Sequence, residues 1–152
     1  MPYTGGCQCG QLTYAIDADP VVAYCCHCLD CQKQSSSAFG MSVWFPADRF
    51  TVTAGELAVF VTRGSSGSPK TCAFCATCGS RIYNVAIDEP DMLSMKGGTL
   101  DDINGFRPVA HIWTRSAQPW VLSLLDPTMC YAQEPESFDD LIDRFTAPTK
   151  GA

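Results

Sequence analysis

Three short cysteine clusters constrain this chain more than any other feature of its sequence. The densest is Cys26-His27-Cys28-Leu29-Asp30-Cys31, and the others are Cys7-Gln8-Cys9-Gly10 and Cys75-Ala76-Thr77-Cys78-Gly79. Two cysteines separated by one residue are too strained to bridge each other comfortably, whereas clustered thiolates are typical ligands of zinc and other thiophilic ions. The clusters therefore predict metal binding.

Two of the clusters together supply four ligands, the number that completes a tetrahedral zinc site. The four are Cys7, Cys9, Cys75 and Cys78. A zinc ion shared by two distant pairs would tie the N-terminal region to the middle of the chain and contribute folding free energy on the order of 10 kcal/mol. Gly10 and Gly79 directly follow the pairs and suit tight turns whose backbone N–H groups point at the thiolates. We expect a structural zinc here.

The remaining cluster supplies only three thiols, Cys26, Cys28 and Cys31, with no obvious fourth ligand. Because side chains alternate along a strand, Cys26 and Cys28 would project to the same side, and a turn would bring Cys31 back toward them. His27 is a candidate fourth ligand, but its place on the opposite strand face favours a packed or hydrogen-bonded histidine. Three protein ligands and an open position are typical of catalytic zinc. This cluster therefore predicts a second zinc, at which a substrate can bind.

The other three cysteines stand outside these sets. Cys25 and Cys72 form additional Cys-x-x-Cys spacings with Cys28 and Cys75, so each is an alternative ligand or an exchange thiol. A thiol buried in the core is the simpler interpretation of both, and Cys130 is interpreted as a bystander. A disulfide framework would need an oxidising compartment, of which the sequence gives no indication.

Composition places the chain among soluble globular proteins of one domain. It has 152 residues, 46% of them apolar, and no run of about 18 uncharged apolar positions that would span a membrane. The N-terminus lacks the basic and apolar segments of a secretory signal, so we expect a cytoplasmic protein. The net charge of −6 excludes nucleic acid as an expected partner, because no basic patch would neutralise phosphates.

Short apolar runs separated by turn residues predict a mainly β fold. In the segment 11–17, Leu12, Tyr14 and Ile16 alternate with other residues and would share one face of a strand. Further strands are expected at 21–26, 41–45, 50–53, 57–62, 81–87, 92–96 and 109–114. We predict a small β-sandwich-like fold of short antiparallel strands, stabilised by zinc.

The C-terminal region has a different periodicity. After Ser137, a suitable N-cap, four apolar residues recur at helical spacing: Phe138, Leu141, Ile142 and Phe145. One amphipathic helix is expected over about 136–146. We divide the chain into a β domain at 1–125 and a C-terminal extension at 126–152 that belongs to the same domain.

Other candidate binding residues are less specific. Trp44, Trp113 and Trp120 are expected in the core rather than at a ligand site, and His111 is interpreted as a hydrogen-bonded core histidine. A group that binds an anion must come from the lysines and arginines, and the sequence does not choose among Lys33, Arg63, Lys70, Arg81, Lys96, Arg107 and Arg115.

Four motifs in a fixed order carry a resemblance to a known family. They are Gly-Cys-Gln-Cys-Gly-Gln-Leu-Thr-Tyr at 6–14, Cys-His-Cys-Leu-Asp-Cys-Gln-Lys at 26–33, Phe-Cys-Ala-Thr-Cys-Gly-Ser at 74–80, and Gly-Thr-Leu-Asp-Asp at 98–102 with Arg-Pro-Val-Ala-His-Ile at 107–112. From about Gly5 to Trp120 the chain resembles the glutathione-dependent formaldehyde-activating family, which includes centromere protein V. The resemblance implies a zinc-stabilised, β-rich fold with two zinc ions per chain. The structural zinc carries over to Cys7, Cys9, Cys75 and Cys78, and the catalytic zinc to Cys26, Cys28 and Cys31.

The resemblance also implies zinc-dependent carbon–sulfur lyase chemistry. A thiol such as glutathione would bind at the open position of the catalytic zinc and add to formaldehyde, giving an S-hydroxymethyl adduct, or the adduct would be cleaved in reverse. Because thiols add to formaldehyde unaided, the alternative is a non-enzymatic, zinc-stabilised module that binds a thiol conjugate or a protein partner. A redox-sensing switch at Cys25 or Cys72 is a third hypothesis. The physiological substrate, the glutathione-binding residues and the oligomeric state are not predicted.

Overall fold

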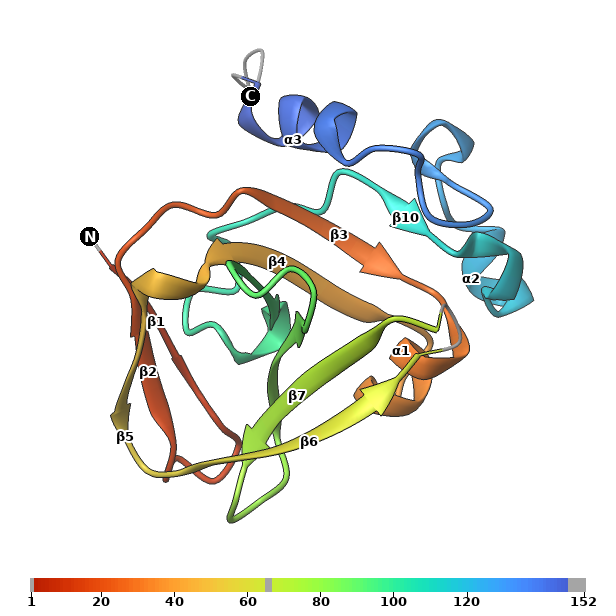
Figure 1. Ribbon diagram of the computed structural model, residues 1–152. Coiled ribbons are helices and arrows are strands. Elements are labelled where there is room, and N and C mark those ends of the chain that lie inside the picture. Colours follow the sequence, from red (N-terminus) through yellow and green to blue (C-terminus); the bar gives the residue numbers. More distant parts are fainter. Residues whose placement is uncertain (1, 65–66, 148–152) are drawn as a thin grey trace. The chain divides into compact units, whose positions relative to one another are not determined.

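A computed structural model describes residues 2–64 and 67–147 of the chain (Figure 1). The fold is mainly β, as predicted, with antiparallel sheets and a C-terminal helix. Within the described ranges, every helix is too short or too polar to span a bilayer.

The described residues group into two compact units, each drawn from two segments of the chain. The first unit takes Met1–Pro20 and Ser42–Gly105, and the second takes Val21–Met41 and Phe106–Ala152. The expected domain division at residue 125 stays a prediction. Residues 148–152 of the expected C-terminal extension lie outside the described residues.

The first unit contains two sets of antiparallel strands. One sheet has the order β1-β2-β5, with bounds Tyr3–Gly6, Thr13–Ile16 and Phe50–Ala54. In the other set each strand pairs with the next in the order β4 (Gly40–Pro46), β9 (Met92–Lys96), β8 (Arg81–Ala86), β7 (Pro69–Cys75) and β6 (Leu57–Arg63). The 3₁₀ helices η1 (Ala47–Arg49) and η2 (Gly97–Thr99) follow β4 and β9. Strands β6 to β9 therefore form a meander of consecutive antiparallel neighbours.

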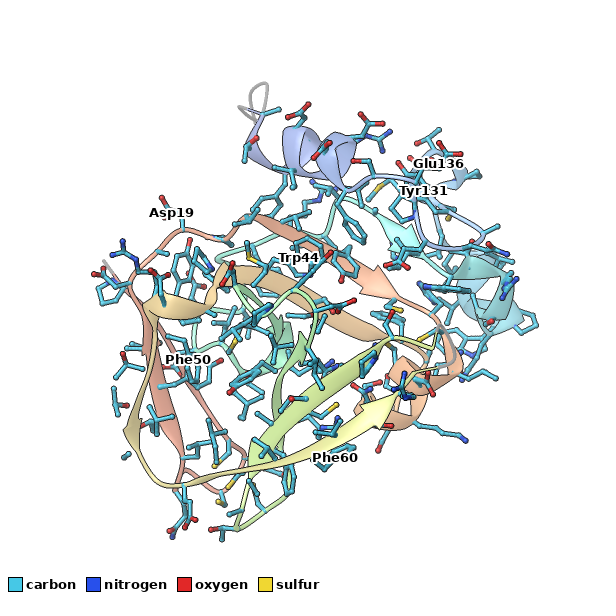
Figure 2. All side chains as sticks on the ribbon, in the orientation of Figure 1. Asp19, Trp44, Phe50, Phe60, Tyr131 and Glu136 are labelled. Carbon is cyan, nitrogen blue, oxygen red and sulfur yellow. The ribbon has the colours of Figure 1, made fainter. Side chains whose placement is uncertain are left out.

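The alternating apolar residues at and before β2 form the core of this unit. Leu12, Tyr14 and Ile16 are at most 1% exposed, as their shared strand face predicts. Aromatic rings join the two sets of strands: the centroids of Phe50 in β5 (Figure 2) and Tyr83 in β8 lie 5.3 Å apart in an edge-to-face arrangement. Contact between two sheet faces through their side chains is the packing expected of a β-sandwich.

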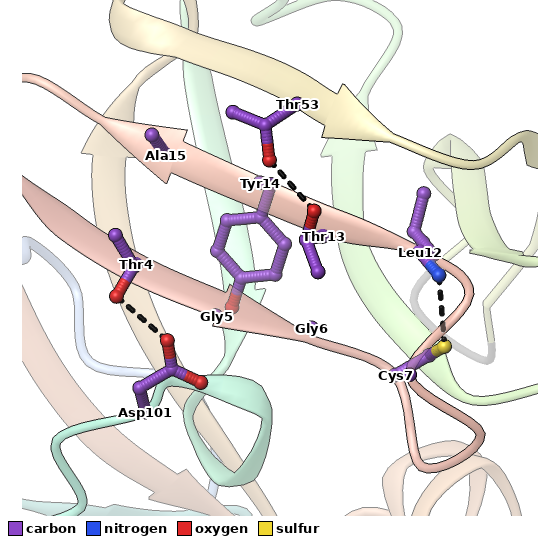
Figure 3. A pocket seen from close by; sticks show the side chains of 11 residues that line it. Thr4, Gly5, Gly6, Cys7, Leu12, Thr13, Tyr14, Ala15, Thr53 and Asp101 are labelled. Atoms are coloured by element: carbon purple, nitrogen blue, oxygen red, sulfur yellow. Dashed lines mark hydrogen bonds between the residues drawn. The ribbon is translucent and has the colours of Figure 1, made fainter.

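The side chain of Tyr14 also limits which residue can stand opposite it in β1 (Figure 3). Its hydroxyl donates to Thr99 Oγ1 at 2.8 Å, because that oxygen already uses its own hydrogen on the carbonyl of Lys96 at 2.8 Å. Gly5 of β1 lies against this pair, and a Cβ there would overlap the Tyr14 ring and the Thr99 carbonyl oxygen. Only glycine therefore fits at this position.

The second unit combines a short parallel ladder with three helices. β3 (Val22–Cys26), all of whose residues are buried, pairs in parallel with β10 (His111–Ile112). The helices are α1 (Leu29–Ser35), α2 (Pro119–Leu122) and α3 (Asp139–Thr146), and the 3₁₀ helices are η3 (Thr114–Ser116) and η4 (Pro127–Met129).

Helix α3 packs against β3, as an amphipathic helix should. Leu141 is fully buried, and the rings of Tyr24 and Phe138 lie 5.4 Å apart. The helix begins at Asp139, later than the predicted start near 136, and its N-cap is Phe138. Ser137 still contributes, because its Oγ accepts the backbone N–H of Asp139 at 3.1 Å. The helix was therefore predicted correctly, and its first residue was not.

We expect the buried Tyr14 hydroxyl to make the fold sensitive to alkaline pH. Burial raises the pKa of Tyr14 to about 12, from an ordinary value of 10.0. The folded state thus favours the neutral phenol. The resulting contribution to the free energy of unfolding, about 2 to 3 kcal/mol, is fully present below pH 10 and is lost as the pH rises toward 12. In urea unfolding of the parent and Tyr14→Phe, the stability advantage of the parent should shrink between pH 10 and 12. An advantage that stays constant over this range would contradict the prediction.

Candidate metal centres

The four-cysteine cluster, Cys7, Cys9, Cys75 and Cys78, gathers within the first unit. Two of its thiols lie on the loop between β1 and β2, one ends β7, and one lies in the turn before β8. All four sulfurs are within 4.8 Å of one another, with the Cys7 and Cys9 sulfurs 3.4 Å apart and the Cys9 and Cys75 sulfurs 4.0 Å apart. A tetrahedral site with Zn–S bonds of about 2.3 Å places its sulfurs about 3.8 Å apart. The donor set therefore fits zinc.

Tight glycine turns hold this cluster in place. Gly10 and Gly79 have φ values of 75° and 78°, a left-handed conformation that glycine adopts without strain. Their N–H groups donate to the carbonyl oxygens of Cys7 and Cys75, at 3.1 and 2.9 Å. The N–H groups that reach sulfur belong to other residues: Leu12 donates to Cys7 Sγ at 3.2 Å, and Cys75 Sγ accepts the N–H two positions further on at 3.4 Å. The turns were predicted correctly, and the donors to sulfur were not.

Ser80 links the two halves of the four-cysteine cluster. The backbone N–H of Gln8 donates to Ser80 Oγ at 3.0 Å, and that hydroxyl lies 3.2 Å from Cys78 Sγ. Hydrogen bonds from Ser80, first from its hydroxyl and then from its backbone, lower the pKa of Cys78 to about 5. The thiolate is thus favoured, as it must be in a zinc ligand.

The three-cysteine cluster, Cys26, Cys28 and Cys31, gathers within the second unit. Cys26 ends β3, Cys28 is the N-cap of α1, and Cys31 lies in the first turn of that helix. Cys28 Sγ accepts the backbone N–H of Cys31 at 3.3 Å, so the predicted turn is the start of a helix. Cys28 and Cys31 are half-buried, and solvent reaches both. Over residues 2–64 and 67–147, no fourth histidine, cysteine or carboxylate ligand joins these three sulfurs.

These three thiols share negative charge unequally. Hydrogen bonds from Cys26 and Cys31 lower the pKa of Cys28 to about 2. Hydrogen bonds with Cys28 and Cys31, and then burial, raise the pKa of Cys26. One ionised sulfur is therefore stabilised by neighbouring S–H donors, and a metal cation would replace these protons and release them to solvent.

His27 lies outside the thiol group and pairs with His111. Its Nε2 is 3.0 Å from Nδ1 of His111, the residue is fully buried, and its ring packs against Phe39 with centroids 5.1 Å apart. Burial, followed by the charge of His111, lowers the pKa of His27 to about 4, so the ring is neutral near pH 7. Its Nδ1 has no hydrogen-bond partner in the described part of the chain. The prediction that His27 is a packed histidine is therefore confirmed. His111 is hydrogen-bonded as predicted, but it is half-buried and not a core residue.

Two glutamines that the sequence analysis did not single out support the three-cysteine cluster. Gln32 Nε2 donates to the carbonyl oxygens of His27 at 2.8 Å and Ser116 at 2.9 Å. Gln32 Oε1 accepts from Gln118 Nε2 at 3.3 Å. The first of these bonds fixes the peptide between two of the thiols, as hydrogen bonds around metal ligands commonly do. The available signal was the position of Gln32 directly after Cys31.

The three remaining cysteines join neither cluster. Cys25 and Cys72 are buried, as expected of core thiols, and burial raises the pKa of Cys25 to about 12. Cys130 is half-buried, and its Sγ donates to the carbonyl oxygen of Asp126 at 3.3 Å.

We predict that the two clusters differ in their contribution to stability. Cys78→Ser should lower the free energy of unfolding by several kcal/mol, because a closed metal site that joins distant segments contributes to folding directly. Cys28→Ser, the matched change in the three-cysteine cluster, should lower the free energy of unfolding much less. Thermal unfolding of the zinc-loaded variants, followed by circular dichroism, measures the difference. Equal losses in the two variants would contradict this division.

A family model and a solved structure relate this chain to known proteins. The model of the family described as "Glutathione-dependent formaldehyde-activating enzyme" matches residues 2–116. The chain is also similar to the crystal structure of a Rhodobacter sphaeroides protein, with 19% identity and a TM-score of 0.50 over 66% of this chain and 90% of that chain. The structural likeness supports the fold alone. Because the family match spans more than half of its length, this chain belongs to the glutathione-dependent formaldehyde-activating enzyme family.

Proposed function

We propose that this protein is a zinc-dependent carbon–sulfur lyase that forms or cleaves the S-hydroxymethyl adduct of a thiol such as glutathione. The observation that carries the proposal is the contrast between four gathered sulfurs in one cluster and three in the other. Four thiolates fill a tetrahedral shell, whereas three leave one position for a substrate. Family membership supports a thiol and formaldehyde as the reacting pair.

Each cluster would hold one zinc ion, giving two per chain. The four-cysteine cluster would hold the structural ion and the three-cysteine cluster the catalytic one. Zinc at the latter would supply Lewis acidity, which lowers the pKa of a thiol at the open position. A reducing cytoplasmic environment would keep both sets of thiols available.

The chain itself orients the three-cysteine cluster and leaves it accessible. The Cys31 N–H fixes Cys28 Sγ, and Gln32 fixes the carbonyl of His27. Gly40 lies against this cluster, because a Cβ there would be in ordinary contact with Cys31, 3.4 Å from its Cβ and 3.9 Å from its Sγ. Cys28 and Cys31 are only half-buried, so a small thiol could reach them from solvent.

The proposed reaction balances without an oxidant or reductant. In the forward direction a carbon–sulfur bond forms between the thiol sulfur and the carbonyl carbon of formaldehyde. The carbonyl π bond opens, and the proton lost from the thiol ends on the oxygen as a hydroxyl hydrogen. Cleavage of the adduct reverses each of these changes.

A module that binds thiol conjugates without turnover would use the same two clusters, so kinetics must separate it from the lyase. Exchange between glutathione, formaldehyde and their adduct can be followed at equilibrium by exchange NMR. The zinc-loaded parent should accelerate this exchange above its spontaneous rate.

We predict that Cys28→Ser returns the exchange rate to the spontaneous value. A loss of about 100-fold or more is expected, since even the hydrogen-bond partners of metal ligands can contribute that much. Cys130→Ser is the matched control, because Cys130 belongs to neither cluster, and it should exchange as the parent does. A parent that binds glutathione but leaves the rate at background would replace the lyase with the binding module.

A further inference from the structure

Strand β6 presents an exposed apolar edge in the first unit. It is the last strand of its set and pairs on one side only, with β7 (Figure 1). Val59, Phe60 and Val61 are 59%, 42% and 64% exposed, and no other three consecutive large apolar residues are exposed in the described ranges. Trp120, expected in the core, is also exposed, so that expectation was wrong. Because side chains alternate along a strand, both faces of the β6 edge are open to solvent.

The backbone of β6 leaves hydrogen-bonding groups free along the same edge. The N–H of Ala76 donates to the carbonyl oxygen of Glu56 at 3.2 Å, which makes these two residues a hydrogen-bonded pair in the register of β6 and β7. Hydrogen-bonded and non-hydrogen-bonded pairs alternate along an antiparallel ladder, so the N–H and C=O groups of Leu57, Val59 and Val61 point away from β7. In the described part of the chain, no backbone hydrogen bond reaches these groups. They are therefore available to another strand.

The usual protections against strand pairing are missing from this edge. Soluble proteins guard free edges with charged residues, prolines or bulges. The run Leu-Ala-Val-Phe-Val-Thr at 57–62 has no charge and no proline, and its pairing with β7 has no register shift. Contacts hold Phe60 (Figure 2) in place, because its ring centroid lies 6.1 Å from that of Phe74 and 4.8 Å from Cζ of Arg81. The edge is thus a regular apolar strand that can accept a partner.

The sequence of β6 is symmetric about Phe60, which makes the edge complementary to itself. Val59 and Val61 flank Phe60 on either side. In two copies paired antiparallel about Phe60, Val59 of each would lie opposite Val61 of the other, and these are residues whose backbone groups face the edge. The two Phe60 side chains would then meet in a non-hydrogen-bonded pair, where opposite side chains lie closest.

Charge at the two ends of β6 favours the same orientation. Glu56 directly precedes the strand, Arg63 ends it, and both residues are exposed. Antiparallel pairing brings the acidic end of each strand beside the basic end of the other copy. Parallel pairing would instead bring like charges together, which destabilises paired strands.

We infer that the edge of β6 binds a second copy of this chain, in a twofold symmetric dimer whose two β6 strands pair antiparallel about Phe60. The same patch serves both copies, as a twofold interface requires. The dimer removes the free edge from both copies and buries the exposed valines. This inference is independent of the proposed lyase activity, since β6 contains none of the clustered cysteines.

Sedimentation equilibrium of the zinc-loaded full chain under reducing conditions, from about 1 μM to about 1 mM, tests the inference. The parent should pass from monomer to dimer over this range. Val61→Lys should raise the dissociation constant about tenfold or more, because the dimer would then hold two lysines among its valines. Ile103→Lys is the matched control, since Ile103 is 69% exposed and lies outside β6, and it should dimerise as the parent does.

Charge reversal tests the orientation with substitutions at exposed positions. Arg63→Glu should weaken the dimer about tenfold, because it places two acidic residues together at each end of the paired strands. Adding Glu56→Arg to Arg63→Glu should restore the dissociation constant of the parent. Circular dichroism should confirm that each variant is folded.

The inference has three ways to fail. A parent that stays monomeric up to about 1 mM would overturn it, including the case in which the edge pairs only with a strand of a different protein. A dimer that Val61→Lys leaves intact, or that Ile103→Lys weakens equally, would place the interface elsewhere. A double charge reversal that weakens the dimer as much as Arg63→Glu alone would overturn the antiparallel pairing.

Discussion

The structure gathers seven sulfurs into two small groups, and each group could hold a metal ion whose positive charge would let its thiols ionise together. In the four-cysteine cluster the nearest sulfurs are 3.4 Å apart, a distance at which two thiolates repel strongly when water is excluded. Hydrogen bonds from Leu12 and Ser80 offset part of this repulsion. A zinc ion would neutralise most of the rest, and it would tie together segments such as Cys9 and Cys75, which are 66 positions apart.

The three-cysteine cluster also consists of thiols, but it lies where strand β3 leads into helix α1 and forms a different kind of site. Cys26 ends β3, and the N-cap and first turn of α1 supply Cys28 and Cys31. The last two thiols are three positions apart in the sequence, close to one helical turn, so both can face the strand end. Among the described residues no fourth ligand joins these three sulfurs, and Cys28 and Cys31 are only half-buried. A closed cluster and an open one thus follow from local backbone geometry rather than from ligand chemistry.

The features that could be predicted from sequence are those carried by local patterns. The alternation of Leu12, Tyr14 and Ile16 located a core strand, and cysteine spacing located both clusters. Features that depend on partners were missed. The strands β1 (Tyr3–Gly6) and β7 (Pro69–Cys75) were not predicted, because glycines and a proline disfavour strands that only pairing with β2, β6 and β8 stabilises.

Other differences have the same origin. Helix α1 was expected as a turn, since cysteine is not among the usual N-cap residues and the thiol of Cys28 takes that role here. The glycine- and serine-rich sequence from Arg63 to Lys70 predicts a loop of that length. The loop is shorter, because β6 ends at Arg63 and β7 begins at Pro69, and residues 65 and 66 lie outside the described residues. The hydrogen bonds from Gln32 through Gln118 to Trp120 span distant segments with no periodic pattern. Such a network therefore cannot be predicted from the properties of its individual residues.

The central claim is that one cluster closes around its metal and the other keeps a position for a thiol. Native mass spectrometry of the purified chain, with and without glutathione, tests this most directly when the parent is compared with Cys28→Ser. We expect two zinc ions and a glutathione adduct in the parent, and one zinc ion and no adduct in the variant. A single zinc ion that survives Cys28→Ser, with no adduct in either protein, would contradict the claim.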